Sequence, residues 1–267
     1  MPFISVTKVR LYYELHGSGP RLLYISGTGA DLRLKPNIFD WPPAKQFEIL
    51  AFDQRGMGQS DKPNIPYSMQ DYADDAAALL DAVGWDDCLV WGYSFGGMVA
   101  QELALRYPHR IRKVVLAATS SGGAGGSSFP LHQLQFLPPE KYGERMVELN
   151  DTRHDAAWRA SHAQVYASLL QQQSDASKVG AGEAGREIGA RRQIEARKLH
   201  HTYDRLPQLT MPVYICGGLY DGICPTDNLL ALKKQIPNSI LEVFDGGHRF
   251  FLQDDRAFRR ISGFLLE

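Results

Sequence analysis

Ser94 is the residue of this sequence whose setting most clearly indicates chemistry. It lies in the sequence Gly-Tyr-Ser-Phe-Gly at positions 92–96, between an apolar run at 88–91 and a helix-forming stretch. A G-x-S-x-G motif between a strand and a helix is typical of a sharp turn that exposes a nucleophilic serine above a sheet. The two glycines are needed because a Cβ atom would clash where the strand and the helix cross.

A serine hydroxyl is a poor nucleophile at neutral pH, so Ser94 needs a base, and that base needs an orienting acid. His248 and Asp221 each follow a predicted strand in the last third of the chain. The order Ser, Asp, His along the chain is the order that this kind of turn uses. Asp245 is the alternative acid, but it lies only three residues before the histidine, so we favour Asp221.

Acyl transfer at a serine also needs two hydrogen-bond donors for the oxyanion that forms on the substrate. Phe95 opens the helix after the serine, so its backbone N–H has no acceptor within that helix. We assign the second donor to the N–H of Thr28, which lies in a loop after the predicted strand at 22–25. Gly27 and Gly29 flank it and allow a close backbone approach.

These residues need a sheet to position them, and the sequence predicts one. Continuous apolar runs indicate strands that are covered on both faces, which is typical of a mostly parallel sheet with helices on either side. Ser68 and Asp71 form a capping-box pattern for a helix that ends at Gly84. We therefore predict an α/β fold with a doubly wound sheet, whose strands lie at 22–25, 49–52, 88–91, 114–118, 213–216 and 240–244.

The middle of the chain has a different pattern. We find no strand signal there and predict helices at 139–149, 155–173 and 186–203. The Gly- and Ser-rich composition of 119–128 predicts a flexible linker before them. The predicted organisation is thus one α/β core, 1–123 and 207–267, with a helical cap inserted at 124–206.

Taken together, four motifs resemble those of the α/β-hydrolase family: the serine turn at 92–97, the turn at 53–60, the loop at 217–221 and the Gly-Gly-His sequence at 246–248. The resemblance covers essentially the whole core. It implies an α/β-hydrolase fold with a catalytic triad of Ser94, Asp221 and His248, and an inserted cap that sets substrate choice.

The details favour one branch of that family. The loop at 26–33 resembles that of the 3-oxoadipate enol-lactonases and esterases, although Ser26 stands where many members have histidine. Members with an aspartate nucleophile are excluded by Ser94. The carbon–carbon bond hydrolases usually carry tryptophan after the catalytic histidine, whereas this chain has Arg249.

We therefore expect a serine hydrolase that cleaves a small-to-medium carboxylic ester or lactone through an acyl-enzyme on Ser94, with no metal or organic cofactor. Two alternatives remain. One is a carbon–carbon bond hydrolase that cleaves a diketone with the same triad. The other is a ligand receptor with slow turnover, as strigolactone-type receptors on this fold resemble.

Substrate contacts are expected from aromatic residues, namely Phe129, Trp158, Tyr166 and Phe250. The alternative is that such residues simply pack helix against sheet. Six basic residues gather near the end of the predicted cap: Arg186, Arg191, Arg192, Arg197, Lys198 and Arg205. Two interpretations are open for them, a substrate carboxylate site and a solvated helix face, and we favour the solvated face.

Composition sets outer limits on function. The net charge of −1 over 267 residues gives no reason to expect a nucleic-acid or membrane partner. The three cysteines, an odd and sparse set, and the lack of a signal-peptide pattern favour a reducing, cytoplasmic location. The Gly-rich turn at 53–60 superficially suggests a dinucleotide site, but no helix opens inside it and Asp61 replaces the third glycine. The oligomeric state is left open.

Overall fold

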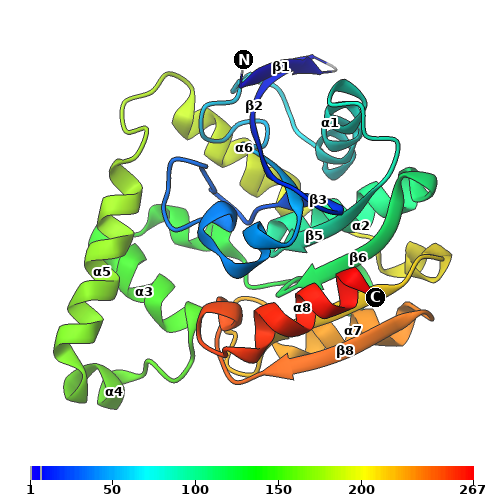
Figure 1. Cartoon of the computed structure of the whole chain (residues 1–267). Helices are drawn as coiled ribbons and strands as arrows, with labels where there is room; N and C mark the ends of the chain where they lie inside the picture. The colour runs from blue at the N-terminus through cyan, green and yellow to red at the C-terminus, as the bar shows by residue number, and fades with distance from the viewer. Residues whose placement is uncertain (1, 7) are drawn as a thin grey trace.

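The structure is a computed structural model that describes residues 2–6 and 8–267, and a mixed eight-stranded sheet is its centre (Figure 1). The strand order is β1-β2-β4-β3-β5-β6-β7-β8. The first two strands join the sheet antiparallel and the others are parallel, which confirms the predicted mostly parallel sheet. The strands are β1 Phe3–Val6, β2 Val9–Gly17, β3 Arg21–Ile25, β4 Glu48–Phe52, β5 Cys88–Tyr93, β6 Ile111–Ala117, β7 Val213–Gly218 and β8 Ser239–Phe244.

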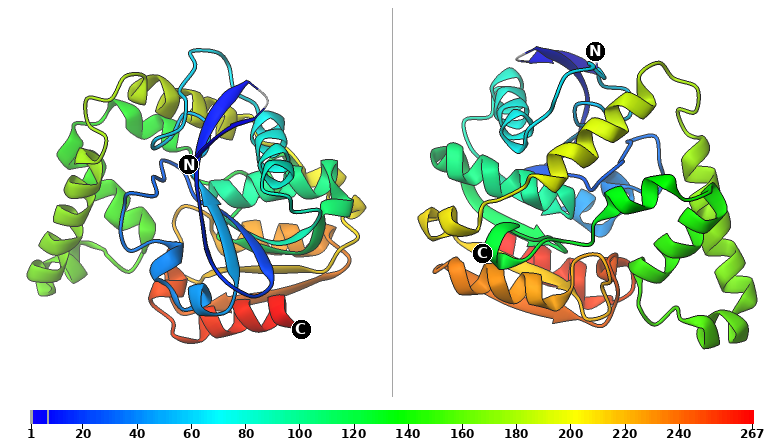
Figure 2. Two further views of the ribbon diagram at one scale, coloured as in Figure 1. Left: turned by 45° about the horizontal axis from the view of Figure 1, so that its top comes forward. Right: turned by 180° about the vertical axis from the view of Figure 1, so that it is seen from behind.

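Helices cover both faces of this sheet (Figure 2). On one face lie α1 Met69–Ala82, α2 Phe95–Arg106 and α7 Thr226–Gln235, and on the other lies α8 Arg256–Leu266. Short 3-10 helices occupy Ile38–Asp40, Pro42–Lys45, Pro108–Arg110, Gly123–Gly125, Leu131–Phe136, Tyr203–Gln208 and Phe250–Leu252.

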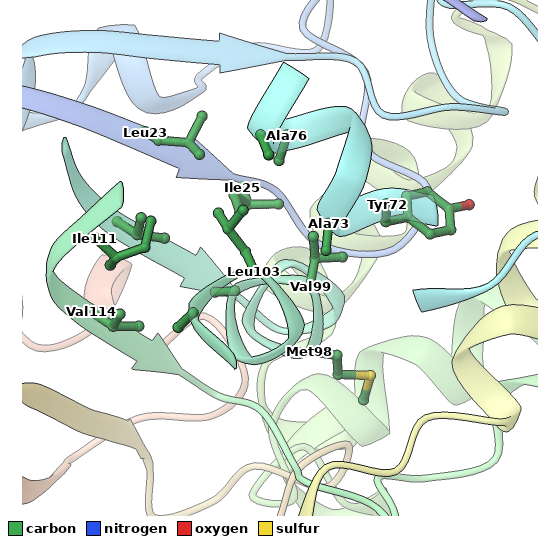
Figure 3. Packing of buried hydrophobic residues seen from close by; sticks show 14 of the residues in the cluster. Leu23, Ile25, Tyr72, Ala73, Ala76, Met98, Val99, Leu103, Ile111 and Val114 are labelled. Atoms are coloured by element: carbon green, nitrogen blue, oxygen red, sulfur yellow. The ribbon is translucent and has the colours of Figure 1, made fainter. Parts of the chain in front are cut away.

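The strands contribute alternate side chains to two separate apolar clusters, as the period of two along a strand requires. Leu23 and Ile25 of β3 pack with α1 and α2, whereas Leu22 and Tyr24 face the layer that contains α8. Figure 3 shows the first layer, in which Val99 and Leu103 of α2 meet Ile25 of the sheet. The rigid sheet therefore holds the loops at the carboxyl ends of its strands in fixed positions.

Helix α1 begins at the capping box that the sequence predicts. The Ser68 hydroxyl accepts from the Asp71 N–H, and the Asp71 carboxylate accepts from the Ser68 N–H, so the predicted capping box is confirmed. Gly84, just after the helix, has φ +72°. That left-handed conformation favours glycine and ends the helix.

Between β6 and β7 the chain forms the proposed helical insertion, residues 124–206. Its helices are α3 Pro139–Asn150, α4 Ala156–Ser161, α5 Ala163–Lys178 and α6 Arg186–Lys198. The predicted helix at 155–173 is in fact two helices, because the backbone at His162 leaves the helical region. Within the described residues, no helix is long and apolar enough to cross a membrane.

The segment at 119–128 differs from its prediction. The side chains of Thr119, Ser120 and Ser121 are buried, and so is that of Ser128. The Thr119 hydroxyl donates to the Ser94 carbonyl at 2.8 Å, and Gln101 Nε2 donates to the Ser120 carbonyl at 3.0 Å. The prediction of a flexible linker is wrong here, because small polar residues also suit a buried strap whose hydrogen-bond partners come from distant parts of the chain.

Candidate active site

Ser94 lies at the tip of a strained turn between β5 and α2. Its φ of 55° is in the left-handed region that residues other than glycine rarely adopt. The Ser94 N–H donates to the carbonyl of Ala117 on the neighbouring strand at 2.8 Å, which ties the turn to the sheet. The serine is only 5% exposed, so it sits within a covered site rather than on an open surface.

The two glycines of this turn are required because there is no room for a Cβ atom at either position. A Cβ atom at Gly92 would lie 2.4 Å from the Gly96 carbonyl oxygen, and one at Gly96 would lie 1.9 Å from the carbonyl oxygen of Ile25. Both obstacles are backbone atoms, so no side chain can move aside to relieve the contact. The requirement for glycine that the motif predicts therefore has a steric cause in this fold.

We expect Gly96→Ala to lower the free energy of unfolding by about 3 kcal/mol or more, since the extra methyl group must displace backbone. Chemical denaturation of the variant measures this loss. Gly263→Ala in α8 is the matched control, because a Cβ atom there meets nothing within 4 Å. Equal stability of the two variants would contradict the steric explanation.

Ser94, His248 and Asp221 come together from the ends of three strands and form a hydrogen-bonded chain. His248 Nε2 lies 2.9 Å from Ser94 Oγ, and His248 Nδ1 lies 2.8 Å from Asp221 Oδ2. A carboxylate can only accept, so the neutral imidazole carries its proton on Nδ1 and offers the Nε2 lone pair to the serine O–H. All three side chains are buried. This arrangement can take a proton from Ser94.

Asp221 is fixed by its own loop. Its Oδ1 accepts from the backbone N–H groups of Ile223 and Cys224, both at 2.8 Å, which leaves Oδ2 for the histidine. The alternative acid, Asp245, has a side chain that is 71% exposed and is paired with Arg153. The structure thus brings Asp221, and not Asp245, to the histidine.

The loop that carries Thr28 lies directly beside the nucleophile. A Cβ atom at Gly27 would be 3.4 Å from Ser94 Cβ. Gln54 Nε2 donates to the Ser26 carbonyl at 2.9 Å and holds the start of the loop. The Thr28 hydroxyl oxygen is buried and has no hydrogen-bond partner among the described residues. Thr28, one of the two proposed oxyanion donors, thus lies in a loop that passes beside Ser94, and Phe95, the other, follows Ser94 directly at the start of α2.

Comparison with known proteins places this geometry in a family. A family description of the alpha/beta hydrolase fold matches residues 20–255. The chain belongs to the α/β-hydrolase family. This α/β hydrolase is 30% identical over 235 residues to a poly(3-hydroxyalkanoate) depolymerase of Ectopseudomonas oleovorans, a match that covers 86% of this chain and 78% of the relative.

Two further relatives carry other activities. A 2-hydroxy-6-oxo-2,4-heptadienoate hydrolase of Pseudomonas putida is 25% identical over 271 residues, covering 93% of this chain and 90% of that protein. The crystal structure of the enol-lactonase from Burkholderia xenovorans LB400 superposes with a TM-score of 0.80 at 20% identity, over 100% of both chains. The two curated relatives are named for different reactions, and the likeness to the enol-lactonase, at 20% identity, shows a shared fold.

Three groups of this α/β hydrolase stand close enough to hold a metal ion, namely Asp221, Cys224 and His248, whose ligand atoms lie within 4.8 Å of one another. Their chemistry does not suit that role. The carboxylate and the imidazole are bonded to each other, and burial raises the pKa of the Cys224 thiol well above its usual range. A thiol that keeps its proton is a poor ligand, so the donor set suits the triad.

The helical insertion supports the triad loops from outside the core. The carbonyl of Asn150, the last residue of α3, accepts from the His248 N–H at 2.6 Å. The carbonyl of Leu149 accepts from the Gly222 N–H at 3.0 Å. A Cβ atom at Gly247 would lie 1.9 Å from the Asn150 oxygen, so the histidine loop and the insertion are in close contact.

Gln193 of α6 is a site residue that sequence analysis missed. It is completely buried, and its Oε1 accepts from the Gly29 N–H at 2.8 Å. Because a backbone N–H only donates, this bond fixes the orientation of the amide and leaves Nε2 buried without a partner. Gln193 therefore holds the loop that presents Thr28. No local motif marks it, since the contact joins residues 164 positions apart.

We expect Gln193→Ala to lower kcat by about 10-fold with little change in KM, because a displaced oxyanion donor weakens binding of the transition state more than that of the substrate. Steady-state kinetics on a p-nitrophenyl ester measure both constants. Gln193→Glu keeps the acceptor for Gly29 and should recover part of the rate. A rise in KM alone would instead assign Gln193 to substrate binding.

The four aromatic residues expected to line the substrate site lie in different parts of the structure. Phe250 is fully buried and stacks on Phe244 with ring centroids 5.2 Å apart, so that expectation is corrected: it is a core residue. Trp158 stacks with His162 on α4, at the outer edge of the insertion (Figure 1). The ring of Tyr166, on α5, packs against the Arg159 guanidinium of α4.

Phe129 lies next to the loop that carries Asp221. Its N–H donates to the Ile223 carbonyl at 2.7 Å, and its ring packs in a small cluster with Ile223 and Cys224. Ile223 and Cys224 are the residues whose N–H groups hold Asp221. Phe129 therefore stays a proposed substrate contact.

Proposed function

We propose that this α/β hydrolase cleaves a carboxylic ester or lactone through an acyl-enzyme on Ser94. The observation that carries the proposal is the chain of two short hydrogen bonds from Ser94 through His248 to Asp221. The strained serine turn and the Thr28 loop beside it supply the remaining requirements of acyl transfer.

The proposed steps assign one role to each of these groups. Ser94 Oγ attacks the substrate carbonyl carbon while its proton passes to His248 Nε2, and the carbonyl oxygen becomes an oxyanion. The Phe95 and Thr28 N–H groups stabilise that oxyanion. Asp221 holds the imidazole ring and stabilises its positive charge. As the intermediate collapses, the carbon–oxygen bond breaks and His248 returns the proton to the leaving alkoxide. A water molecule then attacks the carbonyl carbon of the acyl-enzyme while His248 takes its proton. As the second tetrahedral intermediate collapses, His248 returns the proton to Ser94 Oγ and the carboxylic acid leaves.

Carbon–carbon bond hydrolysis is the second candidate, because one relative is a 2-hydroxy-6-oxo-2,4-heptadienoate hydrolase. Arg249 counts against it, since the proteins with that activity usually carry tryptophan at this position. The relative named as a poly(3-hydroxyalkanoate) depolymerase supports the first candidate, because a polyhydroxyalkanoate is a polyester.

A fluorophosphonate probe tests the proposal, since it phosphonylates an activated serine and mimics the tetrahedral intermediate. We expect mass spectrometry to locate one adduct on the peptide that contains Ser94. Unlabelled enzyme from the same preparation is then assayed on a p-nitrophenyl ester, on an aliphatic lactone and on a vinylogous diketone. Labelling at another residue, or turnover of the diketone alone, would overturn the ester and lactone proposal.

A further inference from the structure

Arg197 in α6 is a buried cation, and no carboxylate among the residues that the structure describes pairs with it. It is 7% exposed, yet its Nη1 donates to the Phe129 carbonyl at 2.9 Å and its Nη2 to the Ser128 hydroxyl at 2.6 Å. Both acceptors are neutral. Its Nε is buried without a partner, and no ion pair within 4.0 Å is found for it in the part of the chain that the structure describes.

The other arginines of this chain show how unusual that is. Buried Arg55 makes a bidentate pair with Asp75, at 2.6 and 2.7 Å. Arg192 and Arg205, from the same basic segment as Arg197, pair with Glu195 and Glu102. A buried charge is costly unless an opposite charge pairs with it, so a carboxylate from outside the chain would suit Arg197. Burial also lowers the pKa of Arg197, which is the sign of an unneutralised cation.

The position of Arg197 relates it to the active site. Its partners Ser128 and Phe129 adjoin the acid loop, where the Phe129 N–H donates to Ile223. Cys224 of that loop has its Sγ within 4.8 Å of ligand atoms of Asp221 and His248. One helical turn before Arg197, Gln193 reaches the oxyanion loop. The buried face of α6 thus spans the site from the oxyanion loop to the acid loop.

We propose that Arg197 binds a carboxylate carried by the substrate. A guanidinium group presents parallel N–H donors that match a carboxylate, and a buried setting strengthens the pair. The substrate class is therefore an ester or lactone that also bears a free carboxylate a few carbons from the scissile carbonyl. This inference rests on the proposed function, which it narrows. It also corrects the favoured interpretation of the basic segment for Arg197 alone, since this residue is buried whereas Arg191 remains exposed and Arg205 partly exposed.

The experiment compares two esters that differ only at the far end of the acyl chain: mono-p-nitrophenyl glutarate, which ends in a carboxylate, and p-nitrophenyl pentanoate, which ends in a methyl group. We expect the wild-type ratio of kcat/KM, glutarate over pentanoate, to exceed unity by about 10- to 100-fold, the worth of a charged hydrogen bond. Arg197→Met should bring that ratio below one, and Arg197→Lys should give an intermediate value.

Arg191→Met is the matched control, because Arg191 lies on the same helix, is exposed and pairs with Glu195 on the surface. Its ratio should equal that of the wild type. A wild-type ratio at or below one, or a ratio that Arg197→Met leaves unchanged, would overturn the proposal and make Arg197 a structural tie between α6 and the strap. If Arg197→Met does not fold, the ratio of the lysine variant decides.

Calorimetric titration separates this inference from the proposed function. Free glutarate should bind the wild type and bind Arg197→Lys at least tenfold more weakly, whether or not any ester is turned over. If neither ester reacts but glutarate binds in this way, the ester proposal fails and the carboxylate site stands. If esters react but glutarate binds both proteins equally, the site fails and the ester proposal stands.

Discussion

Replacing Ser94 by alanine is expected to abolish nearly all ester hydrolysis, with a loss in kcat of about 10³- to 10⁶-fold. The nucleophile supplies the covalent route, and without it only the oxyanion donors and substrate binding remain to accelerate attack by water. Stopped-assay kinetics on a p-nitrophenyl ester measure the loss, and the adduct with the fluorophosphonate probe should disappear as well.

Two controls make this result interpretable. The melting temperature of Ser94→Ala should show that the fold survives, since removing one hydroxyl group leaves the turn backbone and its bond to Ala117 in place. Ser161→Ala changes an exposed serine of α4 and should keep full activity. Near-full activity of Ser94→Ala would place the nucleophile elsewhere and remove the basis of the proposed mechanism.

The second large effect is expected from Asp221→Asn, with a loss in kcat of about 10³- to 10⁴-fold. The asparagine amide has nearly the same shape, but it can donate to His248 Nδ1. It then favours the imidazole tautomer with a proton on Nε2, which cannot accept the proton of Ser94. Because the carboxylate charge also disappears, the imidazolium that forms during the reaction loses its stabilisation.

Asp245→Asn tests the rival acid in the same loop region. Asp245 is exposed and forms a surface ion pair with Arg153, and such pairs contribute about 0–1 kcal/mol to stability. We expect this variant to keep wild-type kcat. The assignment of the acid would be reversed if Asp245→Asn, and not Asp221→Asn, lost activity on the same ester.

The sequence predicted the sheet and the loops at its carboxyl ends because both depend on local patterns. Buried parallel strands require continuous apolar runs such as 88–91, and the sharp turn at Ser94 requires glycine on either side. Asp221 and His248 were found in the same way, since in this fold the residues that follow strand ends converge on one edge of the sheet.

What the sequence did not reveal depends on contacts between distant segments. Gln193 and Asn150 lie in amphipathic helices without a motif, and their partners Gly29 and His248 come from other parts of the chain. Phe250 shows the opposite case: it was expected to contact the substrate as an aromatic residue, but its side chain is buried in the core against Phe244. The composition of the basic segment likewise could not show that Arg197, unlike its neighbours, is buried.

The bond between the Asn150 carbonyl and the His248 N–H has a consequence for how a ligand reaches Ser94. If the whole insertion swung away as a rigid lid, that bond and the one between Gln193 and Gly29 would break together. An opening of that kind would admit the ligand, but it would also release the loops that carry His248 and Thr28 from their contacts with the insertion. A displacement confined to α4 and α5, which contribute no buried residues, would leave both bonds in place. The two bonds thus tie α3 and α6, but not α4 and α5, to the loops of the catalytic groups.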